Sequence, residues 1–155
     1  MDLNKLTMGD RVIAISGIVL FIFSFFDWLG YEGAGPFGGS VAGNAWDFTL
    51  CWLAVLIGLA MVVLVALKAF DVSLPDLGGT SWGLILLVMG VVAFAFVLIK
   101  LIAGPNVPDI LGDAVDGTRK FGIFVGLLAT AGLAAGGYLR FQEDKGAPPS
   151  APPTV

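Results

Sequence analysis

Two aspartates, Asp27 and Asp47, each lie beside a tryptophan at the edge of a long apolar run. A pair of carboxylates could serve as acid and base or could bind a cation. The chain offers few further reactive groups, because it contains no histidine and its only cysteine is Cys51. Histidine acid–base catalysis, an internal disulfide and the usual zinc sites are therefore excluded. No nucleophile and base stand in a recognisable arrangement, so we expect a protein that is not an enzyme and has no cofactor or metal.

The apolar runs must position these aspartates. Hydrophobic residues make up 57% of the 155 residues, and the mean hydropathy is +0.94. Each run is long enough to cross a bilayer core of roughly 30 Å. The sequence predicts an all-α fold, a four-transmembrane-helix bundle of a polytopic membrane protein with a disordered, Pro-rich C-terminal tail. We expect helices at about 12–29, 46–70, 82–103 and 121–141, in a transmembrane domain of residues 1–141 followed by a disordered cytoplasmic tail of residues 142–155.

The basic residues indicate the orientation of this bundle. Four crossings place both termini on one side of the membrane, and cytoplasmic segments are enriched in Lys and Arg. With the termini inside, five basic residues are cytoplasmic and three are outside. We therefore expect a multi-pass protein of the plasma (inner) membrane with cytoplasmic termini. Because no run of Lys or Arg occurs, we expect no nucleic-acid partner.

Small residues mark the predicted packing faces, since backbones in a membrane approach closely only where side chains are small. The fourth run carries such a stripe, and the second run carries a shorter one. The predicted packing residues are Gly122, Gly126, Thr130, Ala134, Ala54 and Gly58.

Charged residues fall on the same stripes. Asp47 lines up with Ala54 and Gly58 at steps of three and four residues, and Lys100 and Asp27 take equivalent positions on their own helices. We predict an ion cluster of Asp27, Asp47, Lys100 and Arg119 at the outer surface, because charges at a membrane face are costly unless they are paired or hydrated. A role in fixing helix register is the favoured interpretation. A ligand or ion site, and snorkelling without pairing, are the alternatives.

Two predicted outer loops contain sequence motifs that are not specific for a ligand site. A G-x-G-x-x-G sequence at residues 33–38 lacks the strand, helix and acid of a dinucleotide site, so it indicates a flexible loop. In residues 104–118, three aspartates share one helical face, which predicts a short amphipathic helix on the membrane surface. The spacing of those aspartates matches no EF-hand calcium loop. Trp28 and Trp46 are expected in the interfacial aromatic belt.

The motifs F-D-W at 26–28, A-W-D-F at 45–48, K-L-I-A-G-P from Lys100 and R-K-F-G-I-F from Arg119 resemble a group of small, uncharacterised four-helix membrane proteins of actinobacteria. The resemblance implies an integral membrane protein of the cell envelope and supplies no reaction. We expect a non-enzymatic accessory or scaffold component whose partners are the lipid bilayer and other membrane proteins or itself. The alternative is a small transporter or channel component that acts as an oligomer.

Overall fold

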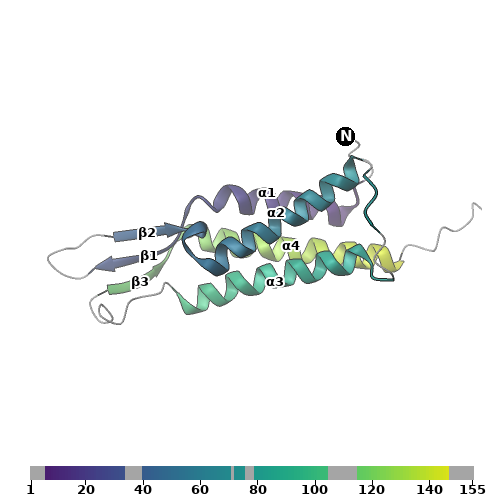
Figure 1. Ribbon diagram of the computed structural model, residues 1–155. Helices are drawn as coiled ribbons and strands as arrows, with labels where there is room; N and C mark the ends of the chain where they lie inside the picture. Colours follow the sequence, from purple (N-terminus) through teal and green to yellow (C-terminus); the bar gives the residue numbers. More distant parts are fainter. Residues whose placement is uncertain (1–5, 34–39, 71, 76–78, 105–114, 147–155) are drawn as a thin grey trace, which may run out of the picture.

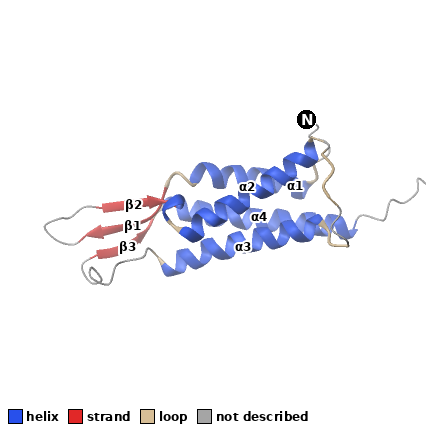
Figure 2. Cartoon of the chain, in the orientation of Figure 1, coloured by secondary structure: helices blue, strands red, loops and turns tan. Residues whose placement is uncertain are grey.

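The computed structural model describes residues 6–33, 40–70, 72–75, 79–104 and 115–146. The described part contains four α-helices, three β-strands and one turn of 3-10 helix (Figures 1 and 2). In chain order these are α1 (Met8–Phe23), β1 (Asp27–Gly33), β2 (Ser40–Asn44), η2 (Ala45–Asp47), α2 (Thr49–Ala69), α3 (Trp82–Ala103), β3 (Val115–Arg119) and α4 (Phe121–Gly146).

The strands form a small sheet that extends beyond one end of the helical bundle, opposite the N-terminus and the end of α4 (Figure 1). The sheet is antiparallel with the order β2-β1-β3. The connection between α1 and α2 thus supplies two strands, and the connection between α3 and α4 supplies the third. The four predicted helices are confirmed and the described part of the chain is mostly helical, but the predicted all-α class leaves out this small sheet.

The first predicted helix differs most from the structure. It was expected at 12–29, but α1 begins at Met8 and ends at Phe23, and Asp27 already opens β1. Trp28 and Leu29 belong to the strand and are fully buried. The length of an apolar run does not distinguish a membrane helix from a buried strand, which explains the error.

Among the described residues, three helices are long and apolar enough to cross a membrane: α2, α3 and residues Phe121–Lys145 of α4. Helix α1 has 16 residues, which corresponds to about 24 Å at 1.5 Å per residue. It is therefore shorter than the roughly 30 Å hydrocarbon core. The crossing of the membrane by α1 stays a prediction.

Helix ends follow local capping chemistry. The Thr7 side chain accepts a hydrogen bond from the Asp10 N–H, and the Asp10 carboxylate accepts one from the Thr7 N–H, which forms a capping box at the start of α1. Helix α3 begins after Ser81, whose Oγ accepts from the Leu84 N–H, and ends at Gly104 with φ +73°. These signals give α3 the predicted bounds of 82–103.

The fourth helix is longer than predicted. It continues to Gly146, so the first residues of the predicted disordered tail are helical. Arg140 pairs with Glu143 and Asp144 three and four residues further on, which stabilises the additional turn. Residues 147–155 of the predicted tail lie outside the described residues.

Helix α4 packs against α1 and α3 through small residues. A Cβ on Gly136 would lie 3.0 Å from the Gly9 carbonyl oxygen of α1. A Cβ on Gly90 of α3 would lie 2.7 Å from the Ala134 backbone of α4. Such approaches let the backbones of neighbouring helices touch, as is common in membrane bundles.

Replacement of Gly90 by alanine tests this contact. The new methyl group would meet backbone atoms of Ala134 and Leu133, which cannot move unless α3 and α4 separate. We expect the free energy of unfolding to fall by about 1–3 kcal/mol, measured by titration of the detergent-solubilised protein with sodium dodecyl sulfate. The matched control is Val91→Ala, because Val91 is 48% exposed. Equal stability of the two variants would contradict the close contact.

Candidate functional site

A buried carboxylate lies at the end of the bundle that is opposite the sheet. Asp10, in the first turn of α1, is only 1% exposed. The capping box with Thr7 fixes its position, since Oδ2 lies 3.2 Å from the Thr7 backbone nitrogen. A buried carboxylate needs further partners to remain ionised.

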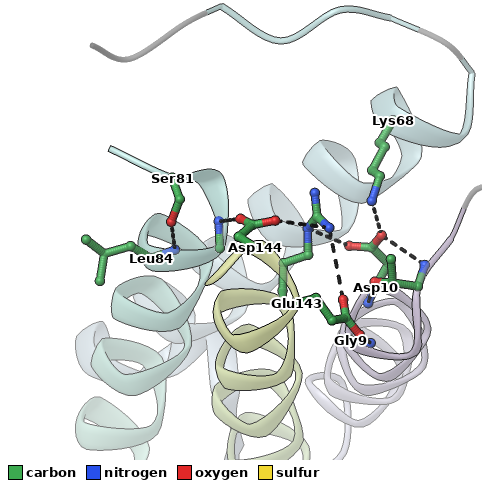
Figure 3. A network of polar contacts seen from close by, with 10 residues as sticks. Gly9, Asp10, Lys68, Ser81, Leu84, Glu143 and Asp144 are labelled. Carbon is green, nitrogen blue, oxygen red and sulfur yellow. Dashed lines mark hydrogen bonds and ion pairs between the residues drawn. The ribbon is translucent and has the colours of Figure 1, made fainter. Parts of the chain in front are cut away.

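Two cations from other helices meet Asp10. Lys68, in the last turn of α2, places Nζ 2.6 Å from Asp10 Oδ2 (Figure 3). Arg140 of α4 places Nε 3.6 Å from Asp10 Oδ1. The Lys68 side chain is 28% exposed and that of Arg140 is 18% exposed, so both cations keep some contact with solvent. Asp10 is thus the junction between α1, α2 and α4.

Two more carboxylates extend the network to α3 and back to α1. Asp144 lies 3.3 Å from Arg140 Nη1, and its Oδ2 accepts a 2.8 Å hydrogen bond from the Gly83 N–H in the first turn of α3 (Figure 3). Glu143 Oε1 accepts from the Gly9 N–H in the first turn of α1. Carboxylates at helix N-termini interact favourably with the helix dipole and satisfy free N–H groups. All four helices are therefore joined at this end. We call Asp10, Lys68, Arg140, Glu143 and Asp144 the ion network.

A small cavity adjoins the ion network. It has a volume of about 20 Å³ and is lined by Asp10, Lys68 and Arg140 together with apolar residues and Trp82. That volume suffices for one water molecule. In the described part of the chain no group of three or more histidine, cysteine or acidic side chains could hold a metal ion. Because the network carboxylates contact cations or backbone N–H groups, the arrangement serves to clamp helices together.

The ion network was not predicted from the sequence. Asp10 precedes the first predicted helix at 12–29, and Glu143 and Asp144 fall in the predicted disordered tail of residues 142–155. One signal was available, because Thr7 and Asp10 have the spacing of a capping box and so mark a helix start. The i+3 and i+4 spacing of Glu143 and Asp144 from Arg140 was a second signal.

The predicted outer ion cluster lies at the sheet end, but its members have different surroundings. Asp27 begins β1 and is exposed, and Asp47 lies in η2, where its carboxylate accepts a 2.9 Å hydrogen bond from the Asn44 N–H. Lys100 is 6% exposed, and its Nζ lies 5.0 Å from the centre of the Phe48 ring. Asp47 therefore forms a local cap. Both aspartates lie outside α1 and α2, the helices to which the predicted stripes were assigned.

Arg119 has a different role from the predicted one. It lies at the end of β3, and its guanidinium donates to the Leu101 and Ile102 carbonyl oxygens in the last turn of α3. In the part of the chain that the structure describes, no ion pair joins Arg119 to Asp27 or Asp47. Arg119 therefore caps α3 and ties the sheet to that helix.

Trp28 is a core residue rather than a member of an interfacial belt. The β1–β2 register shifts between Asp27 and Leu29, and such a bulge redirects a side chain. Trp28 is fully buried, and its Nε1 donates a 2.7 Å hydrogen bond to the Phe23 carbonyl oxygen. Cβ atoms on Gly122 and Gly126 would lie 2.5 and 2.4 Å from its ring. These two glycines of the predicted packing stripe make room for the indole. Trp46 is 37% exposed.

Of the remaining packing residues, Thr130, Ala54 and Gly58 are buried and Ala134 is half-buried. Thr130 and Ala54 are fully buried, and the Thr130 hydroxyl donates to carbonyl oxygens of its own helix. Gly58 of α2 approaches side chains of α1 and α4, namely Leu20 and Leu133.

Both loop patterns fall mainly outside the described residues. Residues 34–38 of the glycine motif and residues 105–114 of the predicted surface helix lie outside the part of the chain that the structure describes. The last residues of that predicted helix form a strand instead, because β3 begins at Val115. Pairing of Thr118 with Gly30 of β1 holds this segment extended.

The described helices place this chain among mostly helical proteins with several candidate membrane spans. Comparison with protein-family models, curated proteins and solved structures finds no match to this chain.

Proposed function

We propose that this protein is a non-enzymatic accessory or scaffold component of the bacterial cell envelope. In this proposal α1 crosses the plasma membrane together with the three longer helices, and both termini lie in the cytoplasm. The ion network is then at the cytoplasmic face and the sheet lies outside. The motif resemblance to small actinobacterial membrane proteins implies a location in the cell envelope.

The observation that carries the proposal is the firm attachment of the sheet to the bundle. Trp28 of β1 is enclosed by α4, the Lys120 N–H donates a 2.8 Å hydrogen bond to the Trp28 carbonyl oxygen, and Arg119 holds the end of α3. A rigidly mounted sheet offers a defined surface for another protein. We therefore assign recognition to the sheet end and anchoring to the helices.

The bundle surface supports lateral contacts in the membrane. Large apolar side chains are exposed along the helices, including Ile18 at 52%, Val63 at 54%, Val88 at 53% and Leu128 at 73%. These side chains face lipid or the helices of a partner. The transporter or channel alternative requires several copies, because backbone contacts at Gly90, Gly136 and Gly137 fill the described interior of one bundle.

Affinity purification from native membranes after crosslinking tests the proposal. We expect the tagged protein to retain a reproducible partner, or further copies of itself, in mild detergent. Glu32 of β1 is 61% exposed, so Glu32→Lys should weaken recovery of a partner that binds the sheet while leaving the bundle folded. Recovery of monomer alone, without any partner, would contradict the scaffold role. Ion flux through liposomes that contain the purified protein would favour the transporter alternative.

A further inference from the structure

An open hollow lies where α1, β1 and α4 meet. Its volume is about 250 Å³, and it is lined by Phe26, Asp27, Lys120, Phe121 and Gly122. Helix α1 has just ended and α4 begins here, so the hollow lies level with the end of a candidate membrane span. In a bilayer this level is the boundary between hydrocarbon and headgroups.

The hollow has walls of opposite charge. The Lys120 side chain is 29% exposed, and its Nζ lies 3.6 Å from Glu32 Oε1. Asp27, an exposed acidic residue at the start of β1, also lines the hollow. Their backbones are held in place, since the Lys120 N–H bonds to Trp28 and a Cβ on Gly122 would lie 2.6 Å from the Asp27 carbonyl oxygen. The charged groups therefore stand on a fixed frame.

Aromatic rings border the same hollow. Phe26 is 51% exposed and Phe121 is 69% exposed. Phe23 joins them into one cluster, with ring centroids 5.0 Å from Phe26 and 6.1 Å from Phe121. Exposed rings beside charged groups at this depth suit a ligand with an apolar part and a polar head. Ring faces also attract ammonium groups.

We propose that the hollow binds the headgroup of a zwitterionic phospholipid with a primary ammonium, of the phosphatidylethanolamine class. The phosphate contacts the Lys120 ammonium, and the lipid ammonium contacts the Asp27 carboxylate beside the phenylalanine rings. A purely anionic headgroup fits less well, because Asp27 and Glu32 would repel it. The inference depends on the membrane location of the chain and holds whether or not a protein partner exists.

Native mass spectrometry of the detergent-solubilised protein tests this inference. Phosphatidylethanolamine and phosphatidylglycerol are added in turn, and the dissociation constant of the first bound lipid is measured. We expect phosphatidylethanolamine to bind more tightly by about tenfold. Lys120→Gln should weaken binding of both lipids, and Asp27→Asn should remove the preference. Lys145→Gln is the control, since Lys145 lies at the other end of α4 over Phe141.

The variant Glu32→Gln distinguishes a direct effect on lipid binding from a folding defect. This change releases Lys120 from its ion pair, so phosphatidylethanolamine should bind more tightly, a result that a folding defect cannot produce. Equal binding of the two lipids by the unchanged protein would overturn the proposal. The proposal would also be overturned if the Lys120→Gln variant bound lipid with the same affinity as the Lys145→Gln control.

Discussion

Trp28→Ala is expected to lower the free energy of unfolding by about 3 kcal/mol. The indole is fully buried between β1 and α4, and Gly122 and Gly126 leave no side chains that could collapse into the space. Its loss also removes the hydrogen bond to the Phe23 carbonyl oxygen. We take the lower end of the range for aromatic truncation, because lipid and detergent solvate apolar groups well. Titration with sodium dodecyl sulfate, followed by circular dichroism, measures the change.

The matched control is Trp46→Ala. Trp46 is 37% exposed, and its Nε1 donates a 3.1 Å hydrogen bond to the Ser24 hydroxyl. We expect a loss of about 1 kcal/mol there. A Trp28→Ala variant as stable as this control would contradict the role of Trp28 in holding the sheet on the bundle.

Asp10→Ala is expected to cost about 3 kcal/mol in the same titration. The substitution leaves Lys68 without its 2.6 Å partner and removes one contact of Arg140. It also removes half of the capping box of α1. We expect a value at the lower end of the range for broken buried pairs, because both cations are partly exposed and can turn toward solvent.

Two further variants separate charge pairing from helix capping. Asp10→Asn keeps an acceptor for the Thr7 N–H but loses the charge, so it should recover only part of the stability. The double variant Asp10→Ala with Lys68→Ala should lose less than the sum of the single variants, since the two residues interact directly. Strict additivity would show that the ion pair contributes nothing. Asp27→Ala, at an exposed position, is the surface control.

The long helices could be predicted from the sequence because hydrophobic length and capping residues act locally. Helix α3 has the predicted bounds, since Ser81 and Gly104 mark both of its ends. The sheet could not be predicted in the same way. Trp28 and Leu29 follow a long apolar run after a single aspartate, and the pairing of β1 with β3 joins segments that are far apart in the chain.

The ion network was missed for a related reason. A charged residue at the end of an apolar run, such as Lys68, has the pattern of a side chain that snorkels toward the headgroups. Its pairing with Asp10 depends on how α1 and α2 lie side by side, and no local pattern contains that information. At the sheet end, Arg119 binds backbone carbonyl oxygens, which every residue carries, so no sequence pattern identifies these acceptors.

The proposed topology places the sheet and the ion network on opposite faces of a membrane. Cys51 is the only cysteine and is fully buried, so Cys51→Ala provides a cysteine-free background. Glu32→Cys then marks the sheet, and Lys145→Cys marks the end of α4. With a membrane-impermeant maleimide on intact cells, we predict labelling of Glu32→Cys at once and of Lys145→Cys only after permeabilisation. Labelling of both positions from the same side would contradict the account.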